Sequence, residues 1–439
     1  MREEGRTAAA LLEFISKSPS CYHVAANMSD ILEKAGFSRL FEEDTWSLAP
    51  GGKYYVTRGG SSLIAVALPR ERVSGFQIAA SHSDSPALKV KEKGEISVDG
   101  RYVKLSVERY GGMIMSSWLD RPLSLAGRIW LEREGRLESR LFCADRDLLL
   151  IPSLAIHMDR KVNEGHSYNV RKDLQPLFSM TGEKSLSQVI AEEAGLKPEE
   201  LAGCDLFLYN RMGGSIWGAQ ESFLSSPRLD DQQCAWASLE GFLKGEGSPG
   251  RVMVYCVFDN EEVGSGTRQG AGSTFLRDVL ERVVAALGGS REDYLRAVAK
   301  SFLISADNAH GVHPNQGDKA DDTSRPYLNG GPVIKYSANQ KYTTDGATGA
   351  VFAALCRRAG VPCQVFHNRP DMEGGSTLGN ISAQQVPIPS VDVGLPQLAM
   401  HSAYETAGVQ DTAWLVQVFA KFFSCPVCGE RDGSYRLEF

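Results

Sequence analysis

Short apolar runs alternate with helical periodicity along much of the chain. Five runs with little charge have the length of strands, at residues 76–81, 252–258, 302–305, 363–366 and 389–393. Such runs predict strands that are covered on both faces. Between them, apolar positions recur at helical spacing in residues 231–245, 273–288 and 348–360. Strands that alternate with helices predict an α/β fold, with a mostly parallel central sheet flanked by helices.

Two other regions depart from this alternation. Residues 7–36 show amphipathic helical spacing that is broken around Ser18-Pro19-Ser20 and ended by Gly36. In residues 87–222, polar and apolar positions alternate and glycines mark tight turns. This pattern predicts antiparallel strands that form a sheet with one solvent-exposed face. Because the α/β pattern resumes near residue 228, we interpret residues 87–222 as an inserted β-rich lid or oligomerisation domain. The catalytic domain would then comprise residues 1–86 and 223–439.

Composition narrows the possible partners of this 439-residue chain. Its net charge of −7 and pI near 5.7 show no excess of positive charge that would bind a phosphate backbone, so nucleic acid is not an expected partner. It shows no secretory signal and no apolar stretch near the roughly 20 residues of a membrane span, so we expect a cytoplasmic protein with reduced thiols. Cys425 and Cys428 form a lone Cys-x-x-Cys. A structural zinc knuckle needs a second ligand pair, so two ordinary thiols are the simpler interpretation.

Acids and histidines follow the predicted strands at the point where each strand ends. The first run is followed by His82 and Asp84, and later runs by Asp259, Glu261, Glu262, Asp307, His310 and His401. Ligands of open α/β sheets bind at the carboxyl ends of the strands. A single histidine is more often a satisfied polar residue than a ligand. Four strands that bring such residues to one edge, however, predict a metal cluster.

Two local units have a clear chemical interpretation. His82 and Asp84 project to the same side of an extended segment, so His82 can bind a metal while Asp84 holds its other ring nitrogen. The alternative is that Asp84 merely caps a helix. Glu261 and Glu262 are adjacent acids at a flexible turn. Such pairs are usually solvated, but here one can bind metal while the other serves as a general base towards an activated water.

Asp230 stands at the start of the helix that resumes the α/β pattern, in Ser226-Pro227-Arg228-Leu229-Asp230-Asp231. A carboxylate at this place can bridge two metals about 3.5–4 Å apart. It can equally be the N-cap of the helix, which requires nothing except a helix start. Both interpretations stay open from the residues alone.

Six ordered motifs resemble those of the aspartyl aminopeptidase family: SHSDSPALKVK, SPRLDD, FDNEEVGSGT, SADNAHGVHPN, GPVIKYS and PQLAMHSAYE. The resemblance covers nearly the whole chain. It implies an α/β catalytic domain with an inserted β-rich domain, assembled into a homododecamer. It also implies two Zn²⁺ ions per subunit, with Mn²⁺ or Co²⁺ as substitutes, and peptides with a free N-terminus as substrates.

The resemblance also implies roles for individual residues. His82, Asp230 and Asp307 match the ligands of one zinc, and Asp230, Glu262 and His401 match those of the other. Glu261 matches the general base, and Asp84 the residue that orients His82. The substrate-contacting positions are matched by His310, Lys335 and Tyr342, together with His157, which a neighbouring subunit lends to the site.

Residues 311–332 form a long Gly/Pro/Asp/Asn-rich stretch before Lys335, and such loops are usually functional. A lysine in a partly dry pocket would favour an N-terminal Asp or Glu, although a solvated surface lysine is the alternative. We therefore expect a metalloaminopeptidase that releases single, acidic N-terminal residues. The alternatives are a related dinuclear zinc deacylase or carboxypeptidase, and an inactive oligomeric scaffold.

Overall fold

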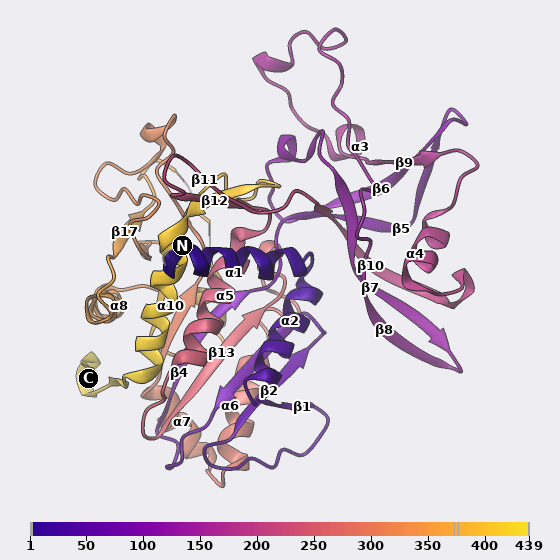
Figure 1. The fold of residues 1–439 in the computed structure, drawn as a ribbon. Helices are drawn as coiled ribbons and strands as arrows, with labels where there is room; N and C mark the ends of the chain where they lie inside the picture. The colour runs from indigo at the N-terminus through magenta and orange to yellow at the C-terminus, as the bar shows by residue number, and fades with distance from the viewer. Residues whose placement is uncertain (1–2, 373, 376, 438–439) are drawn as a thin grey trace.

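The computed structural model describes residues 3–372, 374–375 and 377–437. The chain forms a large α/β part and a β-rich part that projects from it (Figure 1). The α/β part is built on a nine-stranded sheet with the order β1-β2-β3-β13-β4-β14-β18-β16-β17. Its strands are β1 (Ser38–Leu40), β2 (Lys53–Arg58), β3 (Ser62–Ala67), β4 (Gly75–His82), β13 (Arg251–Phe258), β14 (Phe302–Ala306), β16 (Val333–Tyr336), β17 (Gln364–His367) and β18 (Ser390–Gly394).

The centre of this sheet is parallel, as predicted, because β13, β4, β14 and β18 pair in parallel. All five predicted strands are present, which confirms the α/β class. Antiparallel pairs join β2 to β3, β3 to β13 and β16 to β18. The β2–β3 hairpin adds two strands that the apolar runs did not predict. Its strand β2 lies towards the edge of the sheet and combines exposed, half-buried and buried residues.

Helices cover both faces of the sheet because its strands are apolar on both sides. In β13, Met253, Tyr255 and Val257 pack towards one face, and the residues between them pack towards the other. The first face is covered by α1 (Glu3–Lys17), α2 (Cys21–Lys34), α5 (Leu229–Lys244), α8 (Gly346–Ala359) and α10 (Val409–Ser424). The second is covered by α6 (Phe275–Ala286), α7 (Arg291–Ala299) and α9 (Leu378–Ser382). The predicted break between the two N-terminal helices lies between α1 and α2.

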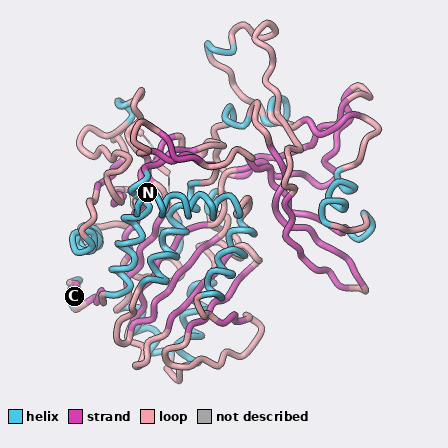
Figure 2. The backbone as a smooth tube through the Cα atoms, viewed as in Figure 1, coloured by secondary structure: helices cyan, strands magenta, loops and turns pink. Residues whose placement is uncertain are grey.

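The β-rich part is a six-stranded antiparallel sheet with the order β8-β7-β10-β5-β6-β9. Figure 2 shows it as mostly strand and loop, with short helices at its periphery. Its strands are β5 (Ala87–Val98), β6 (Tyr102–Tyr110), β7 (Leu123–Arg133), β8 (Arg136–Cys143), β9 (Leu177–Met180) and β10 (Leu201–Asn210), and its helices are α3 (Val170–Asp173) and α4 (Leu186–Ala194). The turn between β5 and β6 has Asp99 and Gly100 at positive φ, the geometry that matches the twist of a tight hairpin.

A third, five-stranded sheet lies beside the nine-stranded one, with the order β11-β12-β20-β19-β15. Its strands are β11 (Ser215–Trp217), β12 (Phe223–Ser226), β15 (Ala309–His310), β19 (Pro396–Leu398) and β20 (Glu405–Gly408), while β21 (Val427–Gly429) and β22 (Tyr435–Leu437) form a separate hairpin. Strand β11 pairs with β12 although it falls within residues 87–222. The domain boundaries stay predictions. No helix of the described residues is long and apolar enough to cross a membrane.

Candidate metal centre

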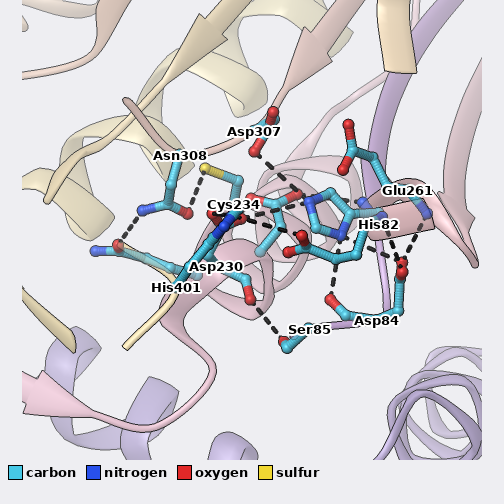
Figure 3. A network of polar contacts seen from close by, with 12 residues as sticks. His82, Asp84, Ser85, Asp230, Cys234, Glu261, Asp307, Asn308 and His401 are labelled. Carbon is cyan, nitrogen blue, oxygen red and sulfur yellow. Dashed lines mark hydrogen bonds and ion pairs between the residues drawn. The ribbon is translucent and has the colours of Figure 1, made fainter. Parts of the chain in front are cut away.

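His82 is the last residue of β4 and is buried at the carboxyl edge of the parallel sheet. Its Nε2 lies 3.4 Å from Asp230 Oδ1 and 3.6 Å from Asp307 Oδ1. Its Nδ1 lies 3.4 Å from Asp84 Oδ1, so the imidazole stands between Asp84 on one side and two further carboxylates on the other (Figure 3). The predicted pairing of the ring with Asp84 is therefore present, and the element that follows Asp84 in the chain is a strand and not a helix that it could cap.

Asp84 also accepts hydrogen bonds from the turn that follows β13. The backbone amides of Glu261 and Glu262 each donate to one of its oxygens at 3.1 Å. A third donor is the hydroxyl of Tyr110, at 2.7 Å, which ends β6 of the six-stranded sheet. Asn260 Nδ2 donates to the Tyr110 hydroxyl at 2.9 Å. Asp84 thus joins His82, the two glutamates and the β-rich part in one network.

Asp230 lies at the centre of the cluster. Its Oδ1 faces His82, while its Oδ2 lies 3.4 Å from Nε2 of His401. The first turn of α5 has no side-chain cap hydrogen bond, so the carboxylate points to the imidazoles and not to the helix amides. Burial alone would raise the pKa of Asp230, but its contacts with His401 and His82 outweigh this effect and hold that pKa well below its usual range.

Glu262 and His401 complete the other side of the cluster. His401 Nε2 lies 3.5 Å from Glu262 Oε2. Burial, together with the charge of Asp230, raises the pKa of Glu262 well above its usual range. Burial also raises the pKa of Glu261 to about 8. Protein contacts alone therefore do not balance the negative charge gathered at this edge.

The donor atoms are spaced as a metal site requires. Among the described residues, three groups of side chains offer ligand atoms that all lie within 4.8 Å of one another. The first group is His82 with Asp230, Asp231 and Asp307. The second is His82 with Glu261 and Glu262, and the third is Asp230 with Glu262 and His401. Asp230 Oδ1 and Glu262 Oε1 are buried and accept no hydrogen bond from the described residues. Buried oxygens without donors are costly unless a cation faces them. Imidazole nitrogens and carboxylate oxygens are ligands that suit zinc.

A cavity opens beside the cluster and contains three of the predicted substrate-binding residues. It is lined by His82, Asp230, Glu261, Asp307 and His401 on one side and by His310, Lys335 and Tyr342 on the other. Lys335 is buried, with Nζ 3.4 Å from Asp307 Oδ2 and 5.4 Å from the centre of the Tyr342 ring. A solvated surface lysine is therefore excluded. Burial would lower the pKa of Lys335, but Asp307 and its neighbours raise it, so the ammonium stays charged.

His157 lies elsewhere. It is exposed in the loop between β8 and α3 and does not line this cavity in the described part of the chain. Leu154, Ile156 and Met158 beside it are 59%, 46% and 75% exposed, an unusual density of apolar surface for one loop. The expectation that a second subunit receives His157 concerns two chains and stays a prediction.

Three residues around the site were not predicted. Asp231 joins the buried cluster and accepts a hydrogen bond from the amide of His82 at 3.2 Å. Tyr110 belongs to the β-rich part, and Glu405 contacts only backbone amides of the cluster. Only the repeated acid in the Asp230-Asp231 pair could have been a signal. Cys425 and Cys428 belong to none of the metal-capable groups among the described residues.

A buried set of imidazoles and carboxylates at the carboxyl edge of an α/β sheet, open to a cavity with a cationic wall, defines a metal-dependent α/β enzyme. Residues 14–423 match the family described as "Aminopeptidase I zinc metalloprotease (M18)". The chain belongs to this family and is a zinc-dependent aminopeptidase, a hydrolase of peptide bonds. The resemblance to the aspartyl aminopeptidase family is thereby confirmed.

Curated relatives and solved structures agree with this assignment. A "Probable M18 family aminopeptidase 2" of Clostridium novyi (strain NT) is 44% identical over 433 residues, which are 97% of this chain and 100% of the relative. A relative of the same description from Pseudomonas aeruginosa (strain UCBPP-PA14) is 42% identical over 94% of this chain and 97% of its own length. The chain in "Cryo-EM structure of the Ape4 and Nbr1 complex" superposes with a TM-score of 0.92 at 35% identity, covering 96% of this chain and 86% of that one. The Saccharomyces cerevisiae mApe1 dodecamer gives 0.84 at 28%, covering 95% and 96%.

Proposed function

We propose that this aminopeptidase releases single acidic residues from peptides with a free N-terminus and that it uses two divalent ions. One ion would be held by His82, Asp230 and Asp307, and the other by Asp230, Glu262 and His401. Zinc is the metal of the family, and Mn²⁺ or Co²⁺ are the expected substitutes. The proposal rests mainly on one observation: a buried, charged lysine faces the same cavity as His82, Asp230, Asp307 and His401.

The residues of this chain divide the chemistry between them. The ions, when bound, would polarise the scissile carbonyl and lower the pKa of a water. Glu261 lines the cavity next to His82 and Asp307. A carboxylate at this place can take a proton from the attacking water and later return it to the leaving amine. Asp84 would fix the orientation of the His82 ring through Nδ1.

Lys335 would set the preference for acidic residues. Its ammonium lies in a buried wall of the cavity. The electrostatic attraction between this ammonium and a substrate carboxylate is stronger there than it would be in water. His310 and Tyr342 flank it, and the ring of His310 stands 5.9 Å from that of Phe366. These three side chains would enclose the first residue of the peptide.

Assembly would complete the site. The yeast mApe1 structure is described as a dodecamer. Its superposition on this chain covers 96% of the mApe1 chain. An exposed loop with Leu154, Ile156 and Met158 has the apolar surface that a subunit contact would bury. We propose a homododecamer in which this loop brings His157 to the cavity of a neighbouring copy.

Aminopeptidase relatives favour this function over a deacylase, a carboxypeptidase or an inactive scaffold. A substrate panel tests the finer proposal: chromogenic anilides of Asp, Glu, Ala, Leu and Lys, assayed with Zn²⁺, Mn²⁺ and Co²⁺. The wild type should give its highest kcat/KM with Asp and Glu, and an N-acetylated peptide should resist cleavage. Activity on the blocked peptide would contradict an aminopeptidase mechanism.

Variants of Lys335 test whether this residue sets the preference for acidic substrates. Lys335→Met should lower kcat/KM for the acidic anilides about 10–100-fold more than for Ala, since a charge-assisted hydrogen bond is worth about 1.5–3 kcal/mol. The ratio between substrates cancels any damage to Asp307. Lys341→Met, at an exposed position, is the matched control and should leave all rates unchanged. An equal loss on every substrate would contradict the role of Lys335 in specificity.

A further inference from the structure

The five-stranded sheet organises one half of the metal cluster. Strand β12 ends four residues before Asp230, and β19 ends three residues before His401. Strand β20, which pairs with both, begins at Glu405, and Glu405 stands opposite Ser226 in the register with β12. The sheet thus brings Glu405 between the two segments that lead to Asp230 and His401.

The Glu405 side chain is buried, with 1% exposed, and it accepts one hydrogen bond on each oxygen. The amide of Asp230 donates to Oε2 at 3.0 Å, and the amide of His401 donates to Oε1 at 2.7 Å. These two residues are 171 positions apart, yet one carboxylate holds the backbone of both. Their side chains also meet, with Nε2 of His401 3.4 Å from Oδ2 of Asp230.

We propose that Glu405 is a positioning residue that fixes the backbone of Asp230 and His401, and thereby the affinity for the ion these two residues share with Glu262. The inference rests on the proposed two-ion site and deepens it. Asp230 also belongs to the other ligand set, but the remaining ligands of that ion, His82 and Asp307, stand at the ends of neighbouring parallel strands and make no contact with Glu405, so that set depends less on it. Loss of Glu405 should therefore weaken one binding event much more than the other.

A carboxylate is the group this position needs. A glutamine of the same size would turn an NH₂ towards one of the two amides, so one buried donor would lose its acceptor. The segment that this amide belongs to is then no longer fixed by Glu405. Residues that orient ligands from behind typically change metal affinity 10–100-fold when they are replaced.

Asp411 provides a matched control within the same chain. It is also buried and also accepts two backbone amides, from Asn329 at 2.7 Å and from Gly331 at 2.9 Å. Neither of these residues belongs to the metal-capable groups. Asp411→Asn therefore removes the same kind of interaction from the fold without touching a ligand.

The test is calorimetric titration of the chelator-stripped full-length protein with ZnCl₂, together with the melting temperature of each stripped protein. The wild type should take up two ions. Glu405→Gln should weaken one binding event about 10–100-fold and the other by less than about 3-fold. His401→Ala should abolish the same event and so identify it. Asp411→Asn should lower the melting temperature and leave both affinities unchanged.

The outcomes separate the two proposals. A wild type that binds two ions, with a folded Glu405→Gln variant that binds both normally or loses both equally, overturns the role of Glu405 alone. The same holds if Asp411→Asn weakens one event as strongly. A wild type that binds fewer than two ions overturns the two-ion proposal and this inference with it. Where Glu405→Gln does not fold, Glu405→Asp keeps the charge but shortens the reach, and the same selective weakening is expected from it.

Discussion

The two ligand sets of the cluster are held in place by different means. His82 and Asp307 follow β4 and β14, neighbouring parallel strands whose register is set by a ladder from Phe302↔Gln77 to Ser305↔Ala80. Asp230 and His401 follow short strands of the five-stranded sheet, and Glu262 lies in the 3₁₀ turn after β13, whose Phe258 pairs with His82. His82 and Asp307, which belong to the first set alone, are positioned by the main sheet, whereas Asp230, which both sets share, and His401 depend on contacts made from outside that sheet.

Several of those contacts come from the β-rich part. The amide of Ile114 donates to the carbonyl of His401 at 3.0 Å, and the amide of Ala403 donates to Ser117 Oγ at 2.8 Å. A Cβ on Gly111 would stand 3.0 Å from Cβ of Glu262, so the backbone passes close to this ligand and a side chain there would press against it. Residues between β6 and β7 therefore support Glu262 and His401 of the second set, and the difference between the sets can be tested.

The largest effect is expected from Glu261→Gln, which separates catalysis from metal binding. Glu261 lines the cavity, but the ligand sets proposed above do not require it. The variant should keep its zinc content and lose about 10²–10⁴ in kcat, the usual contribution of general acid–base catalysis. Steady-state kinetics with zinc analysis measures both quantities. Near-normal turnover would remove Glu261 from its role as the base.

Metal removal should sharpen the comparison. Ions present at about 100 times their Kd stabilise a folded protein by about 2.7 kcal/mol, which corresponds to about 100-fold in local opening. Removal of the ions with a chelator should raise the hydrogen-exchange rates of the backbone amides of residues 261–264 and 399–405 by up to about 100-fold. The amides of β4 and β14, held by strand ladders, should change by less than about 10-fold. Equal changes in both regions would show that the two sets are held alike.

Acid should loosen the segment that leads to Asp230. Burial and the nearby charge of Arg228 lower the pKa of His23 to about 4. Between pH 6.5 and 4 the unfolded chain thus binds more protons than the folded one, so stability falls as the pH falls through this window. The loss should be about 2–3 kcal/mol at pH 4.5, because this pH lies about two units below the unfolded pKa and each unit is worth about 1.36 kcal/mol. The free energy of unfolding in urea should depend less on pH for His23→Gln than for the wild type. Identical pH profiles of the two proteins would contradict the lowered pKa of His23.

The smallest effect is expected from Tyr110→Phe, which removes one hydroxyl between the β-rich part and Asp84. Asp84 keeps its bonds from Glu261 and Glu262, so the loss should be at most about 10-fold in kcat/KM or zinc affinity. Tyr102→Phe, at an exposed position on the same strand, is the control. A loss above 100-fold would mean that the β-rich part governs the first ligand set as well.

The same division explains how much could be predicted from the sequence. Apolar runs followed by His82, Glu262, Asp307 and His401 are visible in a single sequence, and the six motifs added the bridging role of Asp230, which the residues alone had left open. The five-stranded sheet was missed because its strands have two to four residues, too few for a periodicity. Tyr110 and Glu405 were missed because their partners are a distant carboxylate and backbone amides. Such contacts leave no pattern along the chain.

Anomalous diffraction at the zinc edge, from crystals grown with ZnCl₂, tests the central claim most directly. We expect two peaks per chain, one contacted by His82, Asp230 and Asp307 and the other by Asp230, Glu262 and His401. A single peak, or a pair of ions that does not share Asp230, would contradict the two-ion site.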